Sequence, residues 1–209
     1  MPSKSHRKQR HSEGHARNSG LFRCLPRYGA GVESTQAIVL RRNRLTETSL
    51  IVTWLAPELG RLKTVAKGAL RPRNRLGGVL DLFHQCEIQF QPTRSGDLHT
   101  LREAVLVESF PGVRTEITRV GMASYAVELI ERATEKEAPV PEIFELLQRA
   151  LRFLHARPAT QKAVRHLEAE LARLLGIAEP GIPAAVALER VLHRLPPGRE
   201  DLLHRLPMG

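Results

Sequence analysis

The amino-acid sequence predicts an α+β protein in which a small closed β-barrel is followed by an all-helical domain. Two observations lead to this fold class. Up to residue 109, apolar residues recur at every second position in short segments separated by turns, as they do in strands. After Pro111 and Gly112 the apolar residues recur about every 3.6 positions, which indicates amphipathic helices. The expected parts are a disordered basic tail over 1–34, a barrel domain over 35–112 and a helical domain over 113–209.

The tail carries seven Lys and Arg residues against two acids and shows no periodicity. Its composition predicts disorder. The alternative is that it is a start-site extension absent from the working protein.

Five strands are expected in the barrel domain. In the second of them Leu50, Val52 and Trp54 share one face, because side chains alternate along a strand. Several short strands separated by turns suit a closed barrel better than an open sheet. The expected strands are 36–42, 48–56, 61–66, 83–91 and 98–109, with a short helix or irregular link over 76–83.

The helical domain is expected to hold three main helices and two weaker ones. The third begins after Thr160, a favourable N-cap, and ends before Gly176, which suits the C′ position. The apolar stripes place the main helices over about 117–136, 143–157 and 161–175, and the weaker ones over 184–195 and 200–206.

The net charge of +10 is distributed unevenly along the chain. The tail contributes +5, the barrel domain +4 and the helical domain +1. A basic front with a neutral back half is typical of proteins that bind nucleic acids. The two cysteines form no C-x-x-C pair, so a zinc ribbon is excluded and reduced thiols are expected. With no secretory signal and no long apolar run, we expect a cytoplasmic, nucleoid-associated protein.

A cluster of cations follows the third expected strand, where Gly68 and Pro72 argue against a regular helix. A loop of this kind suits a phosphate backbone, because Lys and Arg neutralise phosphates and release condensed counterions. The alternative is a solvated basic loop without a partner. The residues expected to contact phosphates are Lys67, Arg71, Arg73 and Arg75, followed by Arg41, Arg61 and Lys63.

The sequence contains none of the motifs that mark common catalytic or nucleotide-binding sites, so an enzyme is not expected. Aromatic residues make up only 4% of the chain, and most of those in the barrel domain are expected in its core. Nucleic-acid binding should therefore be electrostatic, weakly selective for sequence and strongly salt-dependent.

Many short segments, in order, resemble RecO, the recombination-mediator family of the bacterial RecF pathway. The most specific of them is Val65-Ala66-Lys67-Gly68-Ala69, followed by Arg75 to Leu80 and Phe83. Other matches are Ala37–Leu40, Thr46–Ser49, Glu58–Arg61, Gly96–Leu98, Leu101–Ala104, Tyr125 with Glu128 and Leu129, and Arg165–Gly176. The likeness covers about residues 35–177.

The resemblance implies an oligonucleotide-binding (OB) barrel followed by a helical domain. It also implies binding of single- and double-stranded DNA, annealing of complementary strands, and partnership with RecR. The acidic C-terminal tail of single-stranded-DNA-binding protein would dock on the helical domain, where the helix carrying Arg165 contributes cations. His166 stands where a second Arg can occur, so this tail site would be weaker or pH-sensitive. Many family members carry a four-cysteine zinc module, but no cysteine follows Cys86, and no metal or other cofactor is expected.

The sequence is also compatible with two other functions. An RNA-binding OB protein of the translation apparatus would show the same barrel and charge, although the helical domain disfavours it. A pure adaptor that docks acidic protein tails would not bind bare oligonucleotides.

Overall fold

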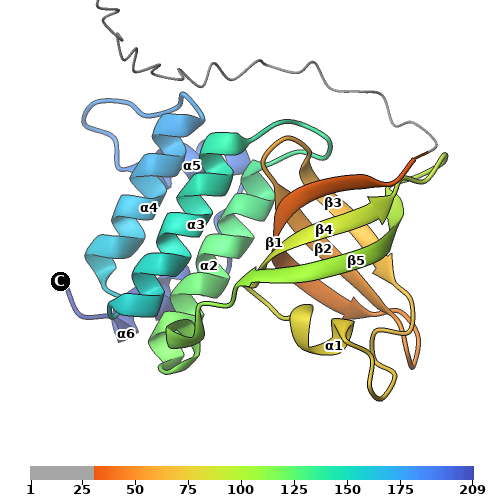
Figure 1. The fold of residues 1–209 in the computed structure, drawn as a ribbon. Coiled ribbons are helices and arrows are strands. Elements are labelled where there is room, and N and C mark those ends of the chain that lie inside the picture. Colours follow the sequence, from red (N-terminus) through yellow and green to blue (C-terminus); the bar gives the residue numbers. More distant parts are fainter. Residues whose placement is uncertain (1–30) are drawn as a thin grey trace, which may run out of the picture.

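The computed structural model describes residues 31–209, which form a barrel packed against a bundle of helices (Figure 1). The five strands close the barrel in the order β1-β2-β3-β5-β4, with β3 and β5 parallel and the other pairs antiparallel. A one-turn helix, α1 (Leu76–Val79), lies between β3 and β4 in the chain. The strands are β1 (Glu33–Arg44), β2 (Leu50–Ala56), β3 (Gly60–Ala66), β4 (Gln85–Gln91) and β5 (Leu98–Glu108).

Alternation of side chains fixes the register of the barrel. Trp54 is fully buried, and its indole Nε1–H donates to the hydroxyl of buried Thr64 across the β2–β3 pair (2.8 Å). This bond satisfies the polar end of the largest side chain in the barrel core. All five expected strands are present, and the expected link over 76–83 contains the short helix α1.

The first strand begins earlier than expected. Glu33 and Ser34 pair with Phe90 and Gln89 of β4, so they belong to the barrel and not to the expected tail. The pairing partner lies more than fifty residues away in sequence, which local composition cannot reveal. The other residues of the tail, except 31 and 32, lie outside the described part of the chain.

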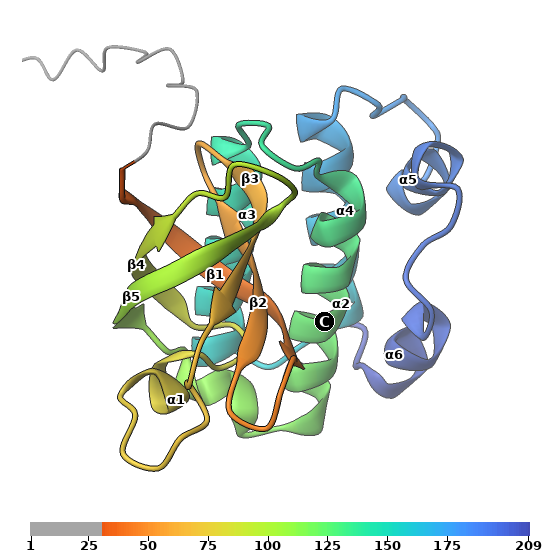
Figure 2. The same cartoon turned by 90° about the vertical axis from the view of Figure 1, so that its right-hand side faces the viewer.

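The helical domain contains the five expected helices and a short 3-10 helix, η1 (Pro111–Arg114), that links it to β5. The Thr160 hydroxyl accepts a hydrogen bond from the Ala163 N–H (3.1 Å), and Gly176 has φ +70°, so both expected ends of the third helix are confirmed. Figure 2 shows the last two helices on the far side of the bundle from the barrel. The helices are α2 (Ile117–Ala133), α3 (Pro141–Ala156), α4 (Gln161–Leu174), α5 (Ala184–Leu192) and α6 (Arg199–Arg205).

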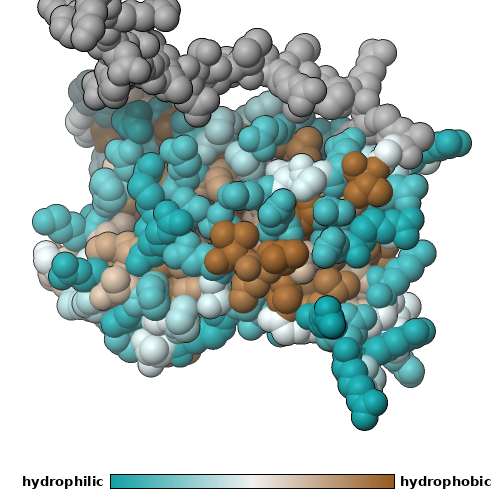
Figure 3. Space-filling view, viewed as in Figure 1, coloured by the Kyte–Doolittle hydropathy of each residue, from teal (hydrophilic) through white to brown (hydrophobic). Residues whose placement is uncertain are grey.

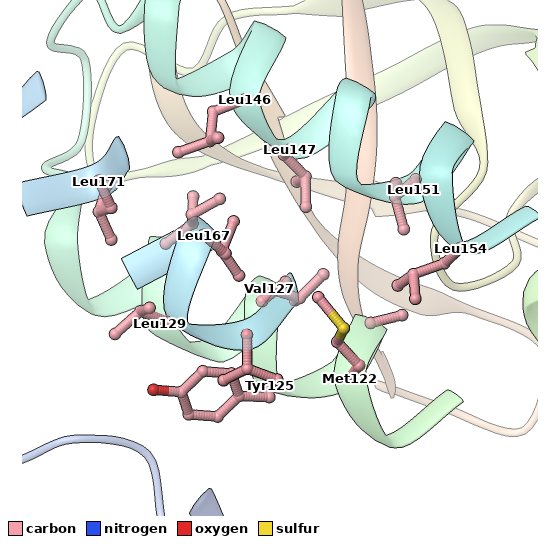
Figure 4. Close-up of a cluster of buried hydrophobic side chains, with 14 of the residues drawn as sticks. Met122, Tyr125, Val127, Leu129, Leu146, Leu147, Leu151, Leu154, Leu167 and Leu171 are labelled. Carbon is pink, nitrogen blue, oxygen red and sulfur yellow. The ribbon is translucent and has the colours of Figure 1, made fainter. Parts of the chain in front are cut away.

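The core of the bundle is built from leucines of α3 and α4 that meet α2, as Figure 4 shows. At its edge lies a buried polar group. The Glu168 carboxylate accepts from the Tyr125 hydroxyl (2.5 Å) and from Arg199 Nε and Nη2 (2.6 and 2.9 Å). Glu168 is 1% exposed, and its contacts join α4 to α2 and α6.

The barrel and the bundle share one apolar core. Ile38, Leu40 and Leu55 of the barrel are buried in the same cluster as the leucines of α3 and α4. At Gly112 the backbones come very close, because a Cβ there would lie 2.0 Å from the His155 carbonyl oxygen. At Gly60 a Cβ would lie 2.3 Å from the Ala138 carbonyl oxygen, in the connection between α2 and α3. The two parts are thus fixed against each other at two glycines and through a continuous core.

Candidate nucleic-acid interface

The loop of residues 67–75, between β3 and α1, is a chain of tight turns. Gly68 adopts φ +68°, and its carbonyl accepts from the Arg71 N–H (3.0 Å) and from the Asn74 side-chain amide (2.8 Å). Asn74 then accepts from the Leu76 N–H (2.8 Å), which leads the chain into α1. These local bonds define the path of a segment that has no regular secondary structure.

The same loop is tied to the turn between β1 and β2. The Leu70 N–H donates to the Thr48 carbonyl (2.9 Å), and the Gly68 N–H donates to the Ser49 hydroxyl (3.3 Å). Both segments lie together at the end of the barrel below α1 in Figure 1, away from the helical domain. The loop is therefore a supported element of the barrel.

The four cations of this loop, Lys67, Arg71, Arg73 and Arg75, are all exposed. Within residues 31–209, none of the four forms an ion pair with a carboxylate. Arg73 adopts φ +66°, a conformation that a non-glycine residue seldom takes and that the surrounding turns impose. Four unpaired charges on a short supported loop form a surface that attracts polyanions.

Two of the other expected contact residues are paired with carboxylates of the protein. On the outer face of the barrel, Arg41 and Lys63 lie on either side of Thr53 in neighbouring strands. Arg41 Nε lies 2.5 Å from a Glu131 carboxylate oxygen, and Lys63 Nζ lies 3.9 Å from Asp97. The hydrogen bond that Arg41 donates to the Glu131 carboxylate also raises the pKa of Arg41 above its ordinary value. Arg41 and Lys63 are thus paired with the protein's own carboxylates, and their contact with a phosphate backbone stays a prediction.

Arg61 lies at the opposite end of β3 from the loop, about 20 Å from Lys67 at the usual rise of a strand. The backbone of Arg61 donates to the Glu135 carbonyl (3.1 Å), and β-bridges join Gly60 and Arg61 to Lys136 in the connection between α2 and α3. The structure thus brings together the four loop cations but leaves Arg61 at a separate place, beside Lys136.

Hydrophobic and cationic surfaces are separated on the barrel. Figure 3 shows hydrophobic residues gathered over β5, where Val105, Leu106 and Val107 are 41–53% exposed. Most of the barrel aromatics were expected in the core, and all four are buried: Trp54, Phe83, Phe90 and Phe110 are at most 4% exposed. Among the described residues of the barrel, no exposed aromatic ring is available for base stacking, so charge must dominate any binding of a single strand.

A second candidate site lies between α3 and α4. It is a pocket of about 430 Å³ with an apolar floor that includes Met122, Leu146 and Leu167. Its rim carries Arg149, Lys162 and His166.

The structure separates the two neighbouring residues expected to bind a partner tail. His166 lines the pocket, whereas Arg165 is exposed elsewhere on α4 and donates to Gln161 (3.1 Å). Successive residues of a helix point about 100° apart, which follows from 3.6 residues per turn. Sequence reasoning missed Arg149 and Lys162, although Lys162 lies four residues before His166 on the same helix face.

The described residues contain no group of three His, Cys, Asp or Glu side chains that could hold a metal ion. None of the helices in residues 31–209 is long and apolar enough to cross a membrane.

A closed five-stranded barrel with a helix between its third and fourth strands, joined to a helical domain, defines this chain as an OB-fold protein with a helical extension. Two family models match it: "Recombination protein O N terminal" over residues 32–110 and "Recombination protein O C terminal" over residues 114–179. The chain belongs to the RecO family.

Curated relatives support this membership. DNA repair protein RecO of Roseiflexus sp. (strain RS-1) is 36% identical over 145 residues, which are 69% of this chain and 50% of the relative. DNA repair protein RecO of Pelobacter propionicus is 34% identical over 144 residues, or 69% of this chain and 58% of the relative. The protein of the same name from Bacillus subtilis is 37% identical over 120 residues, or 57% of this chain and 46% of the relative. The match thus spans about half the length of these relatives.

Proposed function

We propose that this chain is a non-enzymatic mediator of DNA repair that binds DNA without reading its sequence and anneals complementary strands. The observation that carries the proposal is the loop of residues 67–75, whose four exposed cations have no carboxylate partner within residues 31–209. Family membership favours DNA over RNA as the polyanion.

The mechanism follows from electrostatics. Two complementary strands repel each other through their phosphates, and cations placed between them lower that repulsion. The loop cations would neutralise the phosphate backbone. The bases would stay free to pair, because the described part of the barrel has no exposed aromatic ring on which they could stack. A surface that holds backbones and leaves bases accessible suits annealing.

The test is a strand-annealing and binding assay over a salt series. If about five phosphates are neutralised, log K should fall against log salt with a slope of about −3.5 for single strands and −4.5 for duplexes. Replacing Lys67, Arg71, Arg73 and Arg75 by Ala should weaken binding to all sequences alike and flatten the slope by up to about 2.8 for single strands.

A matched control removes the same charge from the helical domain, through Ala at the exposed residues Arg157, Arg190, Arg194 and Arg205. Both variants lose four positive charges. Only the loop variant should lose annealing, because the proposal places the phosphate contacts on the loop. Intact annealing by the loop variant, or tighter binding to structured RNA than to single-stranded DNA, would overturn the proposal. No binding to bare oligonucleotides at any salt would point to a pure adaptor.

The pocket between α3 and α4 supports a second part of the proposal, the docking of the acidic tail of single-stranded-DNA-binding protein. Acidic residues of a peptide would meet Arg149, Lys162 and His166 on the rim, and an apolar residue would fill the floor. Docking there would bring the mediator to coated single strands. RecR is the further partner that the family suggests.

Tail-peptide affinity, measured by fluorescence anisotropy, separates the residues of this site. Lys162→Ala and His166→Ala should weaken binding more than Arg165→Ala, because Arg165 does not line the pocket. Equal losses for all three variants would mean that the tail binds the helix surface and not the pocket. Unchanged affinity in all three would exclude this site.

A further inference from the structure

Asp97 holds two cations with a single oxygen. Its Oδ2 atom lies 2.5 Å from Lys136 Nζ and 3.9 Å from Lys63 Nζ. The three residues come from three separate segments: the end of the β4–β5 loop, the outer face of β3, and the connection between α2 and α3. One carboxylate oxygen that faces two ammonium groups resembles the arrangement of a phosphate oxygen held by two lysines.

The recess around these groups is lined mainly by charged and polar side chains. Arg61 also lines it, and its buried Nε atom has no hydrogen-bond partner in the part of the chain that the structure describes. The hydrogen bond and the charge of Lys136 hold the pKa of Asp97 below its ordinary value, so the carboxylate is charged at neutral pH. Thr53, Leu62, His99 and Glu137 complete the lining.

The ion pairs of Asp97 are open to solvent. The side chains of Lys63, Asp97 and Lys136 are 43%, 46% and 53% exposed. Exposed pairs of this kind contribute little to stability, so a polyanion with several contacts can replace the carboxylate. The location is also suitable, because OB-folds bind oligonucleotides with the faces of their second and third strands and the loop between the fourth and fifth.

We propose that Asp97 occupies the place of a DNA phosphate and competes with the phosphate backbone for Lys63 and Lys136. The proposal rests on the proposed DNA binding and adds an internal competitor to it. The competing carboxylate weakens the hold on DNA at the β4–β5 end of the barrel, while the loop of residues 67–75 at the other end stays free. A strand would then be held firmly at one end and released readily at the other.

The test compares Asp97→Asn with Glu103→Gln in the full-length chain. Glu103 is an exposed carboxylate on β5 that pairs with Gln89, so this control removes the same charge from another face of the barrel. Binding of a fluorescent oligothymidine is measured over a salt series beginning at about 50 mM. Asp97→Asn should bind more tightly than the control at low salt, and its slope should be steeper by about 0.7 for each cation freed, up to about 1.4.

A double variant distinguishes this competition from a general effect of charge. In an Asp97→Asn, Lys136→Ala double variant, about half of the gain in slope should disappear, because only Lys63 is then freed. The proposal would be overturned if Asp97→Asn and Glu103→Gln showed the same affinity and salt slope. It would also be overturned if Asp97→Asn bound more weakly and had a lower melting temperature, because Asp97 would then only hold the β4–β5 loop in place. These outcomes differ from failure of the proposed function, in which the wild-type chain itself would show no salt-dependent binding.

Discussion

Glu168 of α4 and Arg199 of α6 form a two-pronged ion pair, in which Nε and Nη2 of Arg199 donate to the two carboxylate oxygens at 2.6 and 2.9 Å. The Glu168 side chain is 2% exposed and that of Arg199 is 16% exposed. The pair connects α6 to α4, which lines the pocket between α3 and α4. Its removal should therefore affect the stability of the whole helical domain.

Arg199→Ala should lower the free energy of unfolding by about 3 to 5 kcal/mol, because it leaves a buried carboxylate with the Tyr125 hydroxyl and no cation. Urea unfolding followed by circular dichroism measures this loss. Arg190→Ala is the control, because Arg190 forms a 3.9 Å pair with Glu179 in which both side chains are more than half exposed. A loss of about 0–1 kcal/mol is expected there. If both variants lose the same amount, the buried pair has no special role.

Gly112→Ala should disrupt the junction between η1 and α3. The new Cβ would lie 2.0 Å from the His155 carbonyl oxygen and 2.7 Å from its ring Nδ1, which accepts from the Gly112 N–H. Overpacking of this kind typically costs about 1–3 kcal/mol. Gly78→Ala is the matched control, because no atom lies within 4 Å of a Cβ there and no positive φ is required. Thermal unfolding should show a lower melting temperature for Gly112→Ala alone.

Asp81 should make the stability of the protein dependent on pH in the acidic range. Burial alone would raise the pKa of Asp81, but the Leu82 N–H and the nearby Arg42 and Arg114 guanidinium groups lower it below its ordinary value. A carboxyl with a lowered folded-state pKa stabilises the protein above its unfolded pKa, about 3.9, and this stability is lost as pH falls through the folded value.

Asp81→Asn should accordingly be less stable than wild type at pH 6, by about 1 kcal/mol because the group is partly exposed. The difference should shrink toward zero as pH is lowered to about 2.5. Melting temperatures at several pH values provide the measurement. A difference that stays constant over this range would show that the charge of Asp81 is not what stabilises the fold.

Cys86 should be unreactive in the folded chain. It is fully buried in the barrel core, and burial raises the pKa of its thiol to about 12. Cys24→Ser leaves it as the only cysteine. Iodoacetamide at pH 8 should then modify the protein far more slowly in buffer than in concentrated urea, because the thiolate is the reactive form. Rapid labelling of the folded protein would mean that the barrel opens readily.

The sequence was sufficient for the strands, the helices and the loop of free cations, because these depend on patterns within a few residues. The Thr160 cap and the Gly176 end are local in the same sense. The pairing of Arg41 with Glu131 could not be predicted, because the two residues lie 90 positions apart and meet only after the barrel packs on α2.

The pocket was beyond sequence reasoning for a related reason. Its rim combines Arg149 of α3 with Lys162 and His166 of α4, and only the packing of the two helices brings the first beside the others. Helical geometry could have favoured Lys162 over Arg165 as the neighbour of His166, since residues four apart share a face. The sequence shows the four-residue spacing of Lys162 and His166, but it does not indicate which face of the helix lines a pocket.

The core shared by the barrel and the bundle has a practical consequence for anyone who wishes to dissect this protein. Ile38, Leu40 and Leu55 are buried against the helices, so a fragment cut after the last strand would expose them to water as an apolar patch. Such a fragment should aggregate in solution. Tests of the proposed DNA binding should therefore use point substitutions in the intact polypeptide and not an excised barrel.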